Sequence, residues 1–186
     1  MVKRTMASLS YGFSTPQDLI AKLSRDGAKL SPEPDPDDVF NFLVTAAAVY
    51  EWIRANFREH SLMIAIGDAL KEGRWESMPQ QVATWILDQS CIPNKHCDVR
   101  RHIFNVLRIC RFGAAASKHF HWEGDVRAIE PQPIVNNWYQ YFFTSRGRDL
   151  YIDQDGEVYG LTQVRDIILQ FYDGLLIHLR GAEFKT

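Results

Sequence analysis

The sequence predicts a mainly helical α+β fold: a helical bundle of five or six helices with a C-terminal three-stranded antiparallel β-meander and a closing helix. Apolar residues recur with helical spacing through most of the chain, and proline or glycine interrupts the pattern at intervals. After Gly124 the pattern changes to aromatic segments separated by turn signals. The length of 186 residues, 46% of them hydrophobic, suits a single domain over residues 1–186 with one sizeable core.

Two N-terminal helices begin with clear capping signals. Thr15 is positioned to cap a helix that starts at Pro16, Asp18 completes a capping-box pattern, and Gly27 lies near the end of this helix. Asp35, followed by a proline, is positioned to cap a second helix. The second helix is apolar on nearly all sides, which predicts that it is the most buried one. Its expected core face contains Val39, Phe42, Leu43, Ala46, Tyr50, Ile53 and Phe57.

The middle of the chain predicts three further helices. The first is short, covers residues 61–72 and is stopped by Gly73. The segment 77–80 resembles a capping box and predicts a helix through residues 82–87. A long helix is expected from about Asp98 to His119.

The C-terminal part predicts the β-meander and the closing helix. Asp155-Gly156 is the strongest hairpin signal in the chain, and it favours a type I′ turn with positive φ at both residues. A second turn is expected at Arg146-Gly147, and Thr162 is positioned to cap the closing helix. The three expected strands are residues 138–144, 149–153 and 157–160.

Charge and hydropathy exclude several classes of protein. A net charge of −2 provides no global field that would attract nucleic acid or an anionic membrane, so such binding requires a local concentration of charge. The longest apolar runs, such as residues 42–50, are far shorter than the ~20 residues that cross a bilayer. No apolar stretch follows Lys3 and Arg4, so we expect no signal peptide and no membrane partner. These features favour a cytoplasmic protein.

The cysteines do not indicate a disulfide framework or a metal site. Cys91, Cys97 and Cys110 are few and irregularly spaced, which is typical of reduced thiols. The spacing of the first two relative to His96 and His102 matches no common zinc pattern, so we predict no metal. No glycine-rich phosphate loop or nucleophile elbow is present, and we predict no cofactor.

Three segments of the chain resemble a group of small bacterial, mostly helical proteins of unknown function. They are residues 12–16 (GFSTP), residues 40–46 (FNFLVTA) leading to Trp52, and residues 117–120 (SKHF). The resemblance implies a helical fold with a late hairpin and a closing helix. In that group a histidine often follows the Thr-Ala step of the second helix, where this chain has Ala48, so an activity that used this histidine would be absent.

The expected helix over residues 98–119 carries a stripe of basic side chains. The stripe lies within an arc of roughly 100° beside the apolar face and is roughly 27 Å long. Asp98 is the only acid on this helix, and a face built only for solubility usually mixes the two signs of charge. The stripe contains Arg100, Arg101, Arg108, Arg111, Lys118 and His119.

Three interpretations of this stripe stay open. It is the solvated face of an amphipathic helix, it pairs within the fold with acids such as Asp35, Asp37, Asp38 or Glu51, or it binds a polyanion. The third interpretation predicts a non-enzymatic binding or regulatory module of a bacterial or phage-borne system. Its ligand-binding residues would be the six of the stripe, and its partner would be nucleic acid or an acidic protein.

The alternative is a metal-independent ribonuclease of the toxin or phage-defence kind. Arg111 and His119 resemble the arginine and histidine that HEPN-type helical ribonucleases place on one helix at a dimer interface. Seven residues separate the two here, against four to six in that family. The resemblance implies that Arg111 holds the scissile phosphate, that His119 acts as acid or base, and that the protein is a homodimer.

Overall fold

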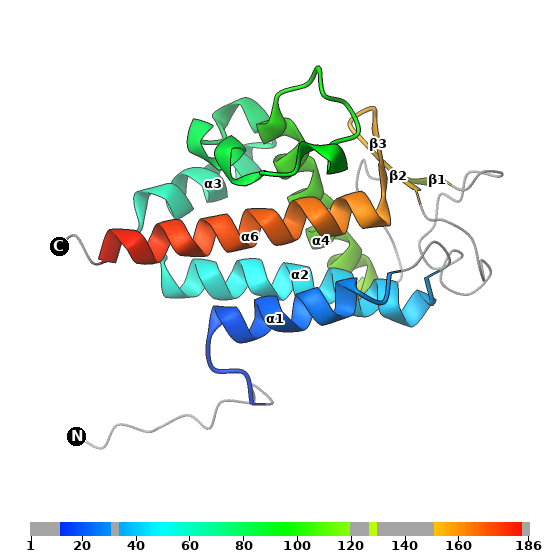
Figure 1. The fold of residues 1–186 in the computed structure, drawn as a ribbon, viewed down its shortest axis with the longest axis horizontal. Helices are drawn as coiled ribbons and strands as arrows, with labels where there is room; N and C mark the ends of the chain where they lie inside the picture. Colours follow the sequence, from blue (N-terminus) through cyan, green and yellow to red (C-terminus); the bar gives the residue numbers. More distant parts are fainter. Residues whose placement is uncertain (1–11, 31–33, 120–126, 130–150, 184–186) are drawn as a thin grey trace.

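The fold is described from a computed structural model, which defines residues 12–30, 34–119, 127–129 and 151–183 (Figure 1). Its α-helices and strands in these ranges are α1 (Pro16–Gly27), α2 (Pro36–Asn56), α3 (Ser61–Glu72), α4 (Val99–His119), β1 (Arg127–Ile129), β2 (Tyr151–Gln154), β3 (Glu157–Gly160) and α6 (Leu161–Glu183). Three short 3-10 helices connect α3 to α4: η1 (Trp75–Ser77), η2 (Gln80–Trp85) and η3 (Gln89–Cys91). The protein is therefore mostly helical with a small antiparallel sheet, as predicted.

Helix α2 lies in the middle of the bundle. It packs against α1, α4 and α6, and Figure 1 shows α6 and α1 running along it. This arrangement places α2 in the core, but the prediction that it is the most buried helix is wrong, because a larger share of the described side chains of α4 is buried and fewer of them are exposed. The residues predicted for its core that are buried are Val39, Phe42, Leu43, Ala46, Tyr50 and Ile53.

The capping signals at Thr15 and Asp35 produce the two predicted N-terminal helix starts, whereas the cap expected at Thr162 is wrong, because α6 already begins at Leu161. The Asp18 carboxylate accepts a hydrogen bond from the Thr15 backbone N–H at 2.8 Å, and the Asp18 N–H donates back to the Thr15 hydroxyl at 3.3 Å. Hydrogen bonds from the backbone of Ser14 and Thr15 lower the pKa of Asp18 to about 2. The Asp35 carboxylate caps α2 by accepting from the N–H of Asp37 at 2.8 Å. These local bonds satisfy donors that the first helical turn leaves unpaired.

The helix expected through residues 82–87 is not formed, and this prediction is wrong. The segment instead forms the 3-10 helix η2, which ends at Trp85. Trp85 packs directly on the backbone of α6, where a side chain at Gly174 would leave only 2.5 Å between its Cβ and the Cβ of Trp85. The backbone leaves the helical conformation at Ile86, with φ of −86° and ψ of 89°, and this residue is buried. Packing against α6 has overridden the local helix signal.

The sheet confirms the predicted hairpin and corrects the rest of the meander. Strands β2 and β3 pair antiparallel, and the turn between them has φ of 53° at Asp155 and 77° at Gly156, as predicted. The predicted strand order is wrong, because β1, residues 127–129, takes the place beside β2 that was expected for residues 138–144. The expected strand 138–144 lies outside the described residues. Its aromatic composition indicates a propensity for extended structure, but strand pairing depends on tertiary contacts.

Within the described ranges, no helix combines the length and the apolar composition needed to cross a bilayer.

We expect Phe42→Ala to lower the free energy of unfolding by about 3–5 kcal/mol, because it removes a fully buried ring from the centre of the bundle. The matched control is Phe40→Ala on the same helix, where the side chain is 38% exposed and the loss should be much smaller. Chemical denaturation of both variants measures the difference. Equal losses would contradict the central position of α2.

We also expect Gly156→Val to destabilise the hairpin, because a β-branched residue is strained at the positive φ of this position. No atom lies within 4 Å of a Cβ built on Gly156, so the effect should come from the backbone and not from a clash. Hydrogen exchange of the β2 and β3 amides should accelerate in the variant. Unchanged exchange would show that the turn tolerates another conformation.

Candidate functional site

Arg100, the first arginine of the basic stripe, is held within the fold. Its side chain is 11% exposed and pairs with Asp98 at 2.6 Å. It also donates hydrogen bonds to the backbone carbonyls of Met78 and Glu76, at 3.0 and 3.2 Å, and its guanidinium lies over the ring of Trp75. These contacts attach η1 to the start of α4, so Arg100 has a structural role.

Arg101 and Arg108 attach the β-hairpin to α4. Arg101 donates to the backbone carbonyl of Asp155 at 2.7 Å and lies 3.7 Å from the Glu157 carboxylate. Arg108, 17% exposed, pairs with the Asp155 carboxylate at 2.9 Å and stacks on the rings of Phe104 and Phe112. The basic stripe is thus paired internally over part of its length, but with acids of the hairpin and Asp98 instead of those considered from the sequence.

A buried polar network beneath these ion pairs also joins α4 to the hairpin. One ring nitrogen of His102, Nε2, lies 3.0 Å from the backbone carbonyl of Asn94 and therefore carries the proton. The other, Nδ1, accepts from the Tyr159 hydroxyl at 2.8 Å, and Asn105 donates to the same hydroxyl at 3.2 Å. Burial lowers the pKa of His102, which favours this neutral form. His102 therefore has a structural role, since both of its ring nitrogens bond within the fold.

Cys97 is likewise held by a fold contact. Its thiol donates to the Glu157 carboxylate at 3.2 Å, and this contact raises the pKa of the thiol. In the part of the chain that the structure describes, no group of three or more histidine, cysteine, aspartate or glutamate side chains is arranged to hold a metal ion.

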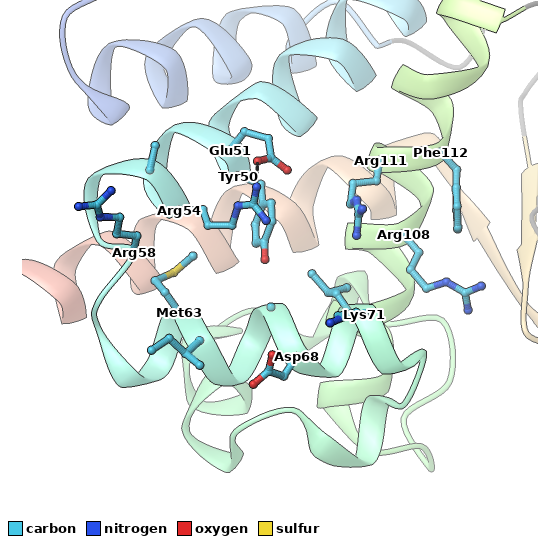
Figure 2. A pocket seen from close by; sticks show the side chains of 14 residues that line it. Tyr50, Glu51, Arg54, Arg58, Met63, Asp68, Lys71, Arg108, Arg111 and Phe112 are labelled. Atoms are coloured by element: carbon cyan, nitrogen blue, oxygen red, sulfur yellow. Dashed lines mark ion pairs between the residues drawn. The ribbon is translucent and has the colours of Figure 1, made fainter.

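A cleft of about 950 Å³ lies between α2, α3 and α4 (Figure 2). Five basic side chains line it against two acidic ones, Glu51 and Asp68, which leaves a local excess of positive charge in a chain whose net charge is −2. The basic residues of the cleft are Arg54 from α2, Arg58 from the turn between α2 and α3, Lys71 from α3, and Arg108 and Arg111 from α4.

Close packing of α4 on α2 places Arg111 at the wall of this cleft. Gly113 lies so near α2 that an added Cβ would be 2.6 Å from Cδ1 of Leu43. The absence of a side chain at Gly113 therefore allows the two helices to approach. Arg111 is exposed, whereas its neighbours Cys110 and Ala114 are buried in the core.

The cations of the cleft differ in whether they are already paired. Arg54 pairs with Glu51 at 2.9 Å, and Arg108 pairs with Asp155. Arg111 and Lys71, by contrast, form no ion pair or hydrogen bond with any residue that the structure describes. Figure 2 shows their side chains entering the cleft from α4 and α3. Arg111 and Lys71 are thus available to an anionic ligand.

The Tyr50 hydroxyl forms a polar point in the cleft between α2 and α3. The residue is only 3% exposed, and its hydroxyl points from α2 toward α3, where it lies 3.8 Å from a Cβ built on Gly67. This hydroxyl has no hydrogen-bond partner among the described residues. Burial raises the pKa of Tyr50, opposed by the charges of Arg54 and Arg111, so the hydroxyl stays protonated and can donate to a ligand oxygen.

The sequence indicated part of this site. Arg108 and Arg111 were predicted as ligand-binding residues and line the cleft, whereas Arg100 and Arg101 do not line it. The side chains of Lys118 and His119 lie outside the described residues, although both positions belong to α4. Sequence reasoning missed Lys71, because α3 carries no stripe of basic residues comparable to that of α4. A glycine in the middle of this helix, at position 67, is a signal in the sequence that one face of α3 is not filled by a side chain.

Comparison of the chain with models of known protein families, with curated proteins and with solved structures finds no match. The two resemblances noted in the sequence therefore stay predictions, and the geometry of the cleft has to carry the functional argument.

We expect Arg108→Glu and Arg111→Glu to differ in stability. Arg108→Glu places a second carboxylate beside Asp155 and should lower the free energy of unfolding by on the order of 1–3 kcal/mol. Arg111→Glu breaks no such pair and should stay within about 0.5 kcal/mol of the wild type. Urea denaturation measures both. A large loss for Arg111→Glu would show that this arginine supports the fold and is not free for a ligand.

Proposed function

We propose that this protein is a non-enzymatic binding module that takes a nucleic-acid strand into the cleft between α2, α3 and α4. The observation that carries the proposal is the pair of unpaired cations, Arg111 and Lys71, in the same cleft as the unpartnered hydroxyl of Tyr50. Phosphate oxygens accept hydrogen bonds from all three kinds of group. An acidic protein is the other polyanion that such a cleft could attract.

Nucleic acid is favoured over an acidic protein by the walls of the cleft. Apolar and aromatic side chains line the cleft together with the cations. Helix α3 contributes Met63 and Ile64, which is 50% exposed, and α4 contributes Phe112. A nucleotide combines a phosphate with a flat apolar base, so it matches both parts of this lining. A run of acidic side chains would leave the apolar walls uncovered.

The ribonuclease alternative requires Arg111 and His119 to act on the same phosphate. Arg111 and His119 are eight positions apart, which is about 12 Å along a helix axis. The resemblance to HEPN-type ribonucleases implies that such a pair acts at a dimer interface, so the alternative also requires a second copy of the chain. The binding proposal requires Arg111 and its neighbours in one copy alone.

We expect the double variant Lys71→Gln/Arg111→Gln to lose most of its affinity for a labelled single-stranded oligonucleotide. Binding should also become less sensitive to salt, with the slope of log K against log salt falling by about one for each lost phosphate contact. Fluorescence anisotropy over a range of salt concentrations measures both quantities. The matched control is Arg25→Gln/Lys95→Gln, which removes the same charge from exposed positions outside the cleft.

Equal losses in the two double variants would show that any attraction is general and not centred on the cleft. Failure of the wild type to bind RNA or DNA at low salt, together with binding of polyglutamate, would favour an acidic protein partner. Cutting of RNA by the wild type that His119→Ala abolishes would favour the ribonuclease.

A further inference from the structure

One acidic side chain in the cleft is not explained by a site that binds phosphate alone. Asp68 lines the cleft and is exposed, and it forms no ion pair or hydrogen bond with any residue in the described ranges. The other acid of the cleft, Glu51, is neutralised by Arg54 at 2.9 Å. An unpaired carboxylate among phosphate-binding cations repels the phosphate, and a hydrogen bond from another part of the ligand to this carboxylate would offset the repulsion.

The position of Asp68 indicates which part of a bound nucleotide would donate this hydrogen bond. Asp68 and Lys71 are three residues apart on α3, so their side chains are neighbours on one helix face, with about 5–6 Å between Cβ atoms. A carboxylate only accepts hydrogen bonds. The ribose 2′-hydroxyl is a donor close to the backbone phosphate along the strand, and DNA lacks it.

The size and the apolar lining of the cleft favour an unpaired strand as the ligand. Its volume of about 950 Å³ is at the upper end of the roughly 300–1,000 Å³ typical of pockets that enclose a small ligand. A nucleotide must leave a duplex to place its base against the apolar wall formed by Met63 and Ile64. Tyr50, which is almost wholly buried, lines the same cleft, and its hydroxyl has no hydrogen-bond partner among the described residues.

We infer that the cleft selects single-stranded RNA over DNA, with Arg111, Lys71 and Tyr50 holding a backbone phosphate and Asp68 accepting a hydrogen bond from the ribose 2′-hydroxyl of the bound nucleotide. This inference rests on the proposed nucleic-acid function and adds the class of ligand. Asp68 is then the residue that distinguishes the two sugars, and the cations contribute affinity without distinguishing them.

The test compares oligoadenylate RNA with oligodeoxyadenylate of the same length by fluorescence anisotropy. The wild type should bind the RNA about tenfold more tightly, as expected for one hydrogen bond to a charged group, and should bind a duplex of that length more weakly than the single strand. Asp68→Ala should bind the deoxy strand as well as the wild type or better, because it removes a negative charge, and should lose the preference for RNA. Asp173→Ala removes an exposed acid of α6 outside this cleft and should keep the preference.

A second pair of variants tests whether the cleft is the binding site without changing the charge of the protein. Gly67→Leu should fill the cleft, since a Cβ at this position has only the Tyr50 hydroxyl within 4 Å, and it should weaken binding of both strands at least tenfold. Gly181→Leu on α6, where a Cβ has no neighbour within 4 Å, should bind like the wild type. Normal binding by Gly67→Leu would overturn the cleft as the site.

The outcomes separate this inference from the function on which it rests. If the wild type binds both strands equally, or if Asp68→Ala keeps the preference for RNA, the selection of RNA by Asp68 is overturned while nucleic-acid binding stands. If the wild type binds neither strand at low salt, the proposed function itself is overturned.

Discussion

The enclosure of α2 is the constraint on which the rest of the structure depends. The broad apolar face of this long helix must be covered, and α1, α4 and α6 provide that cover. The close approach of α4 at Gly113 belongs to the same packing. The last turns of α2 are exposed and polar, with Glu51 and Arg54, and this end lines the cleft with α3. The cleft therefore forms where the burial of α2 ends.

The arginines of α4 serve two purposes that depend on their position along the helix. Toward the N-terminal end, Arg100 and Arg101 are used to attach η1 and the hairpin to the bundle. Arg108 belongs to both regions, since it pairs with Asp155 and also lines the cleft. Only Arg111 is left exposed and unpaired among the arginines of the stripe, as far as the described residues extend. The basic stripe looks uniform in the sequence, but in the structure the acids of the hairpin pair with only some of its arginines.

The cleft also shows why charge has to be considered together with pairing. Glu51 and Arg54 neutralise one another within one helix turn, so neither adds much to the field in the cleft. Arg111, Lys71 and Asp68 form no ion pair with any described residue, so all three are available to a ligand. Two cations beside one acid suit a ligand that carries both phosphates and hydroxyl donors, and a purely anionic surface would not complement the acid.

The sequence alone determined the features that depend on neighbours in the chain. Helix starts at Thr15 and Asp35, the turn at Asp155 and Gly156 and the buried face of α2 were all predicted, because caps, turns and periodicity act over a few residues. Only the tertiary structure decided the partner strand of β2, the 3-10 form of η2, the acids that pair with Arg101 and Arg108, and the convergence of Arg111 with Lys71 and Asp68. Each of these joins segments far apart in the chain, and such contacts are selected by the packing of whole helices, about which local patterns carry little information.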